Sequence, residues 1–147
     1  MCHIVYSTIY RATHYNGVTV MSEGKEVPSP EIEYERWSLE IRRGALSLAI
    51  LAIIRNGESY GYDIMRKLSE EGYEALQVEP STTYPLLRRL EKRGMLEGRK
   101  VKDPDSGRER RHYYLTRDGL MVLKRMVESW KTLNSQLVML LEEAGLT

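Results

Sequence analysis

Apolar and polar positions alternate with a helical period in residues 80–94. At roughly 100° per residue, apolar side chains gather on one face and a basic stripe forms on the other. The face expected to be buried holds Thr83, Leu86, Leu87 and Leu90, and the polar stripe holds Tyr84, Arg88 and Lys92, flanked by Thr82 and Arg89. A hydroxyl of Ser81 or Thr82 is expected to cap the helix, with Pro85 in its first turn and a left-handed Gly94 at its end.

Two further helices are predicted before this stretch. Residues 38–56 have a cap at Ser38 and a stop at Gly57, and they are apolar nearly all round, which predicts burial on two sides, one of them against a second subunit. Residues 60–72 form a shorter helix whose buried face is Ile64, Met65 and Leu68. Two short helices in succession, the second with a basic outer face, are typical of a helix-turn-helix.

A β-hairpin is predicted after the basic helix. Residues 95–102 and 108–115 have strand character, and the Asp103–Gly107 segment between them is rich in turn residues. The tip is flanked by Lys100, Lys102, Arg108, Arg110 and Arg111. A basic hairpin beside a basic helix is typical of the wing of a winged helix-turn-helix. The candidate DNA-binding residues are Tyr60, Ser81, Thr82, Tyr84, Arg88, Arg89, Lys92, Lys100, Arg108, Arg110 and Arg111.

The last stretch, residues 117–147, predicts a long helix capped by Thr116. Apolar positions recur in steps of three and four, at coiled-coil spacing. This predicted dimerisation seam consists of Leu120, Leu123, Val127, Trp130, Asn134, Leu137 and Leu141. An Asn in such a seam weakens the contact but fixes its register. The seam favours a homodimer, and the alternative is an amphipathic helix that packs within its own chain.

The fold class is therefore mainly α with a small β-hairpin wing. Three regions are expected: an extension over 1–37, a winged helix-turn-helix over 38–116 and a dimerisation helix over 117–147. The extension is either a poorly ordered tail or an arm that packs on a neighbour. Residues 4–10 have strand propensity, and Met21 is an alternative translation start. Cys2, His3 and His14 match no common metal-site spacing, so no metal is expected.

The total charge of +1 conceals a segregation along the 147 residues. Residues 80–117 carry 11 Lys or Arg against 5 Asp or Glu, whereas the remainder carries 11 basic and 16 acidic residues. Such segregation indicates a polyanionic partner. The single cysteine, Cys2, suits a reducing compartment. The longest apolar run, residues 45–54, is too short to cross a bilayer, and no signal-peptide pattern is present. We expect a cytoplasmic protein with no membrane partner.

These observations favour double-stranded DNA as the partner and a sequence-specific repressor as the function. The alternative is a winged helix that serves as a protein–protein adaptor, although an adaptor has no need of surplus cations. An enzyme is not expected, because the sequence holds no catalytic triad, no glycine-rich phosphate loop and no metal cluster, and no cofactor is implied. His112 is interpreted as an ordinary wing residue.

Four motifs in order resemble the PadR family of transcriptional regulators. They are Arg43-Gly44-x-Leu46, Tyr60-Gly61-Tyr62, Ser81-Thr82-x-Tyr84-Pro85-Leu86-Leu87-x-Arg89-Leu90-Glu91 and Gly107-Arg108-x-Arg110-x-x-Tyr113-Tyr114-Leu115-Thr116. The resemblance implies a winged-helix homodimer that pairs through its last helix and represses a nearby gene. The single C-terminal helix resembles a shorter subgroup, some of whose members sense flat aromatic compounds.

That resemblance suggests an effector site in the dimer seam. Two Trp130 indoles facing each other would sandwich a flat aromatic ligand, with Val127 and Met126 as soft walls. The alternative is that Trp130 is plain interface core, because aromatic residues are enriched at dimer contacts for packing alone.

Overall fold

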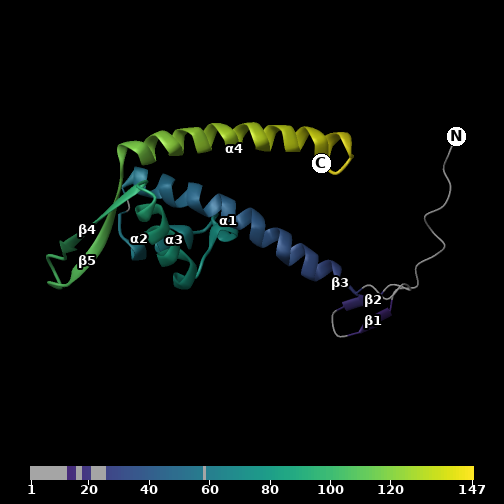
Figure 1. Ribbon diagram of the computed structural model, residues 1–147, viewed down its shortest axis with the longest axis horizontal. Helices are drawn as coiled ribbons and strands as arrows, with labels where there is room; N and C mark the ends of the chain where they lie inside the picture. The colour runs from purple at the N-terminus through teal and green to yellow at the C-terminus, as the bar shows by residue number, and fades with distance from the viewer. Residues whose placement is uncertain (1–12, 16–17, 21–25, 58) are drawn as a thin grey trace. The chain divides into compact units, whose positions relative to one another are not determined.

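The computed structural model describes residues 13–15, 18–20, 26–57 and 59–147, in two compact units over 1–41 and 42–147. The first unit contains three short antiparallel strands in the order β1-β2-β3 and the beginning of helix α1 (Figure 1). These strands are β1 (Thr13–Tyr15), β2 (Val18–Val20) and β3 (Glu26–Pro28). The expectations for residues 4–10, for Cys2 and His3 and for a start at Met21 fall outside the described residues.

Helix α1 (Pro30–Asn56) begins eight residues before the predicted start at Ser38. The Ser29 hydroxyl accepts a hydrogen bond from the backbone N–H of Ile32 at 3.4 Å, and Pro30 occupies the first helical position, where its missing N–H is not needed. Acidic residues in the first turn, Glu31 and Glu33, favour the positive end of the helix dipole. Gly57, at φ +121°, follows the helix as predicted.

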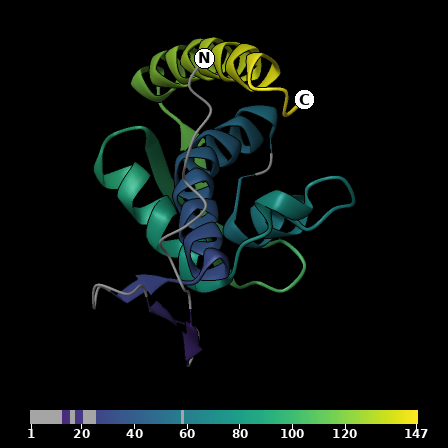
Figure 2. The ribbon, with the colours of Figure 1, turned by 90° about the vertical axis from the view of Figure 1, so that its right-hand side faces the viewer.

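The second unit has the element order of a winged helix. After α1 come α2 (Gly61–Leu68), the 3₁₀ turn η1 (Glu74–Leu76), α3 (Pro80–Lys92), β4 (Leu96–Lys102), β5 (Glu109–Leu115) and α4 (Arg117–Glu143). The predicted class, mainly α with a hairpin wing, is confirmed. In the view of Figure 2, α2 and α3 appear on either side of α1. Helices α2 and α3 also pack against each other. The described helices are all too short or too polar to cross a membrane.

Two predicted helix boundaries are corrected. Helix α2 ends at Leu68 rather than at Gly72. Helix α3 begins at Pro80, and its N-cap is Glu79, which makes no capping bond through its side chain. The predicted caps, Ser81 and Thr82, therefore lie inside the first turn, because a proline is well suited to the first helical position. For the same reason Pro85 lies beyond the first turn rather than within it.

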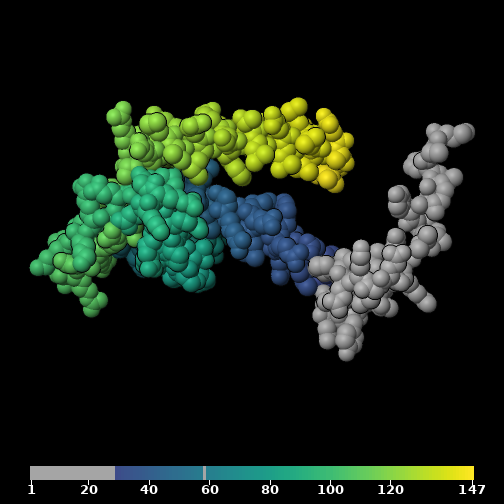
Figure 3. Space-filling model, in the orientation of Figure 1, coloured from purple at the N-terminus to yellow at the C-terminus, as the bar shows by residue number. Residues whose placement is uncertain are grey.

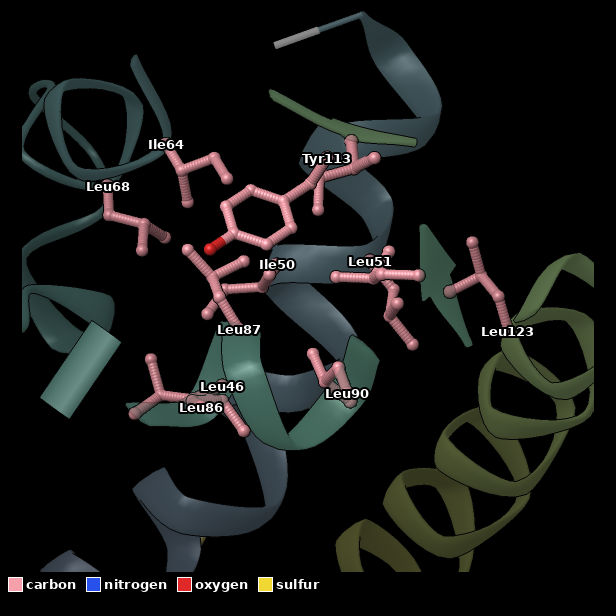
Figure 4. Close-up of a cluster of buried hydrophobic side chains, with 12 residues drawn as sticks. Leu46, Ile50, Leu51, Ile64, Leu68, Leu86, Leu87, Leu90, Tyr113 and Leu123 are labelled. Carbon is pink, nitrogen blue, oxygen red and sulfur yellow. The ribbon is translucent and has the colours of Figure 1, made fainter. Parts of the chain in front are cut away.

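One apolar core joins every element of the second unit (Figure 4). The predicted inner face of α3 is confirmed, since Thr83, Leu86, Leu87 and Leu90 are all buried. The remaining core residues are Leu46, Ile50, Leu51 and Ile54 of α1, Ile64 and Leu68 of α2, Leu96 of β4, Tyr113 of β5 and Leu123 of α4. Met65 is only half-buried. Because α3, the hairpin and α4 contribute to the same core, packing holds the orientation of α3, and its polar face points to solvent.

Thr116 caps α4 as predicted: its hydroxyl accepts from the Gly119 N–H at 2.9 Å and lies 2.6 Å from the Gly94 carbonyl oxygen. We expect Thr116→Ala to lower the free energy of unfolding by about 1–2 kcal/mol, since the cap and the tie to the end of α3 are both lost. Urea denaturation followed by circular dichroism measures the change. Thr116→Ser keeps the hydroxyl, so equal stability of the Ala and Ser variants would contradict the expectation.

Candidate nucleic-acid interface

The outer face of α3 presents its cations to solvent. Arg88, Arg89 and Lys92 are exposed and, within the part of the chain that the structure describes, form no ion pair. Ser81 and Thr82 are also exposed, and Tyr84 is 38% exposed. The opposite face of the helix is held in the core, so these groups are available to a polyanion without reorganisation of the helix.

The wing is an ordered hairpin, which confirms the prediction, and it projects from the second unit (Figure 3). Strands β4 and β5 pair antiparallel from Leu96↔Leu115 to Lys102↔Glu109. At the tip, the Asp103 carboxylate accepts from the N–H groups of Ser106 at 3.0 Å and Asp105 at 2.9 Å, which lowers the pKa of that carboxyl. The backbone of the turn is thus stabilised by a side chain of the turn itself.

The predicted wing cations differ in whether they form ion pairs and hydrogen bonds within the protein. Arg108 and Lys102 are exposed and form no ion pair with any described residue, and Lys100 has only a long contact of 3.8 Å to Glu109. Arg110 instead donates to the Tyr60 hydroxyl at 2.7 Å and pairs with Asp103 at 3.2 Å.

Arg110 therefore links the wing to the start of α2. Its guanidinium also lies 5.1 Å from the centre of the Tyr60 ring, within the range of a cation–π contact. Arg111 pairs with Glu91 of α3, and this hydrogen bond raises the pKa of the Arg111 guanidinium. Both arginines connect the wing to the helices, whereas Arg88, Arg89 and Lys92 of α3 form no ion pair among the described residues.

A hollow of about 770 Å³ lies where α2, α3 and β5 meet. Its lining is Tyr60, Gly61, Tyr62, Tyr84, Arg88, Glu91, Arg110, Arg111 and Tyr113. The structure thus brings together five of the predicted DNA-binding residues, whereas Ser81, Thr82, Arg89, Lys92, Lys100 and Arg108 lie outside this lining. A Cβ on Gly61 would lie 2.5 Å from a ring carbon of Tyr84, so only glycine permits this approach of α2 to α3.

Four residues of the hollow were not among the predicted site residues: Gly61, Tyr62, Glu91 and Tyr113. The Tyr62 ring stacks near Tyr60 with centres 6.4 Å apart. Burial, reinforced by the Glu91 charge, raises the pKa of the Tyr113 hydroxyl. The alternation of β5 offered one signal, because Arg111 and Tyr113 must point to the same face of the hairpin.

His112 has a structural contact that fits its interpretation as a wing residue. Its Nδ1 lies 2.9 Å from the Ser59 hydroxyl, and its ring lies 5.1 Å from that of Tyr60. Together with a bridge between Tyr60 and His112, this contact joins β5 to the segment before α2. Across the described ranges, no cluster of His, Cys, Asp or Glu is suited to hold a metal ion.

The predicted seam of α4 divides into a covered and an open part. Leu123 is buried, and Leu120, Val127 and Leu141 are half-buried, whereas Asn134 is exposed and Trp130 and Leu137 are 46% and 48% exposed. Met126 and Val127 pack against the chain's own core. Further exposed apolar residues outside the predicted seam are Leu133, Val138, Met139 and Leu140. The apolar surface at the far end of α4 is therefore wider than the seam pattern indicated.

The helix-turn-helix, the hairpin and the cationic outer face of α3 together define a DNA-binding protein of the winged-helix class. The family model described as "Transcriptional regulator PadR-like family" matches residues 50–125. The chain therefore belongs to this family of transcriptional regulators. This confirms the resemblance predicted from the motifs, and it identifies a regulator rather than an enzyme.

Individual relatives are similar to parts of this chain, and two of the three described here carry the name of a transcriptional regulator. "Transcriptional regulator Rv3488" of Mycobacterium tuberculosis is 39% identical over 85 residues, which cover 57% of this chain and 74% of that protein. An uncharacterized protein of Lysinibacillus sphaericus is 32% identical over 91 residues, 62% of this chain and 83% of its own length. The crystal structure of a PadR family regulator from Eggerthella lenta superposes with a TM-score of 0.64 at 33% identity and covers 76% of this chain and 95% of its own.

Proposed function

We propose that the protein is a sequence-specific repressor that binds an inverted-repeat operator as a homodimer. The observation that carries the proposal is a row of exposed cations on α3 that form no ion pair with any described residue: Arg88, Arg89 and Lys92. The opposite face of this helix is buried in the core. Arginine and lysine in the major groove contact guanine edges or phosphates. The wing cations Lys100, Lys102 and Arg108 would contact the backbone beside the groove.

Selection from a random duplex library, with the full chain as bait, tests the sequence specificity. We expect enrichment of an inverted repeat with half-sites about 34–36 Å apart, one helical turn. Gel shifts at two salt concentrations then separate DNA binding from the adaptor alternative, because each phosphate contact steepens the fall of affinity with salt. An adaptor would enrich no sequence. Repression is tested by placing the selected site within a reporter promoter, where expression should fall when the protein is present.

The dimer is proposed to form through α4. The open part of the seam, Trp130, Asn134 and Leu137, with the neighbouring Leu133 and Leu140, is an apolar strip with a single polar interruption. Large exposed apolar strips of this kind favour association with another chain. On this proposal residues 38–116 bind DNA and residues 117–147 bring two copies together.

An effector site at Trp130 is a second proposal, supported by the half-exposed indole beside Met126 and Val127, which pack against the core. A planar cationic dye is expected to quench Trp130 fluorescence in the dimer, because stacked aromatic rings are favourable and a ligand between two subunits contacts both. Trp130→Leu removes the signal and leaves Trp37 as background. Unchanged fluorescence of the intact dimer over the whole titration would leave Trp130 as interface core.

A further inference from the structure

Glu91 is an acid on the helix proposed to meet DNA, and its carboxylate binds the wing. One oxygen, Oε1, accepts from the backbone N–H of Gly98 in β4 at 3.2 Å and also from the Arg111 guanidinium in β5. The other, Oε2, accepts from Arg111 Nε at 3.3 Å. A single side chain therefore connects α3 to both strands of the wing.

The strand is shaped to admit this contact. A Cβ on Gly98 would lie 2.5 Å from Arg111 Nε and 2.7 Å from Glu91 Oε1, so any larger residue would push the ion pair apart. Glycine weakens a strand, and its presence inside one often marks a close approach of another group. The close approach here is that of the Glu91–Arg111 pair.

The negative charge of Glu91 is unfavourable on a surface that is proposed to bind DNA. It lines the same hollow as Arg88, Arg110 and Arg111, where a carboxylate repels phosphates. Removal of the charge should therefore strengthen general attraction to DNA. A group that weakens general binding and fixes the angle between two DNA-contacting elements can still improve discrimination, because specificity is a difference between two affinities.

We propose that Glu91 is a positioning residue that determines specificity: it fixes the wing relative to α3 and keeps Arg111 away from the DNA phosphates. This inference rests on the proposed function. In Glu91→Gln the charge is lost, the tie to Arg111 weakens and Arg111 is released. Affinity for the selected duplex should fall about tenfold, whereas affinity for a random duplex should rise about twofold.

The experiment measures dissociation constants of the full chain for the selected duplex and for a random duplex of equal length at one salt concentration. Glu109→Gln is the matched control, because it removes an exposed wing acid whose only described ion pair is the long contact to Lys100. It should raise both affinities together. Gly98→Ala keeps every charge but separates the pair, so it should lower affinity for the selected duplex alone. Thermal melts verify that each variant is folded.

A second measurement, made without DNA, reports the position of the wing relative to α3. Spin labels at Ser106 and Arg93, in a Cys2→Ser background, should give one narrow distance distribution in the wild type and a broader one in Glu91→Gln.

Equal loss of both affinities in folded Glu91→Gln, or an unchanged ratio between them, would overturn the inference and leave the proposed function intact. Failure of the wild type to enrich any sequence would overturn both.

Discussion

Leu137→Asp is expected to convert the dimer to a monomer and to abolish specific DNA binding in the same step. Leu137 is half-exposed in the single chain, yet lies in the open part of the α4 seam, where a partner helix would cover it. A carboxylate there would be buried without a counter-ion in each subunit, which costs several kcal/mol per charge. Loss of the second half-site should reduce apparent affinity for an inverted repeat by about 10²–10⁴.

Light scattering at micromolar protein measures the first effect and titration of the selected duplex the second. Ser135→Asp is the control, since it adds the same carboxylate at an exposed position on the other side of α4. That variant should remain dimeric. A dimeric Leu137→Asp protein, or a monomer that keeps full affinity for the inverted repeat, would contradict the assignment of this helix.

Arg88→Ala is expected to cost about 1–3 kcal/mol of binding free energy on the selected duplex and to relax the preference at one position of each half-site. Arg88 projects from the face of α3 opposite its buried residues, and it forms no ion pair in the described chain, so its removal leaves no protein group unsatisfied. The loss should therefore come from the DNA contact itself.

Arg93→Ala is the matched control, since it removes the same charge from the C-cap of α3, away from the Tyr84–Arg88–Lys92 stripe. It should weaken all duplexes slightly and leave the preference unchanged. Repeating the library selection with each variant distinguishes base reading from general attraction. If Arg88→Ala and Arg93→Ala behaved alike, Arg88 would be a phosphate contact and not a base contact.

Local patterns predicted those parts of the molecule that local physics determines. The inner face of α3 and the Thr116 cap of α4 depend on residues within a few positions of one another, and the hairpin depends on the turn residues 103–107 between its strands. All three features are present. The start of α1 was missed because residues 30–37 are exposed and show no apolar period from which a helix could be inferred.

The side-chain contacts that connect different elements could not be predicted from such local patterns. Glu91 and Arg111 are 20 positions apart, and Tyr60 and Arg110 are 50 apart, so their contacts arise only when the core brings α2, α3 and the hairpin together. Three of these four residues, Tyr60, Glu91 and Arg110, belong to the family motifs, and Arg111 was predicted as a cation of the wing. The sequence could not show that two of the expected DNA-contacting arginines are held by partners within the protein.

The contacts along the outer edge of β5 affect where another β-strand could pair with the wing. This edge is occupied: the Tyr113 N–H donates to the Ser59 carbonyl, and Tyr60 bridges to His112. In the described chain, β4 is the strand of the hairpin whose outer edge no other described segment pairs with, and it carries Arg99, Lys100 and Lys102. Charged side chains on an open edge discourage a second sheet from pairing with it. On the proposed function, the wing cations that would contact the phosphate backbone would thus also hinder one wing from pairing with another.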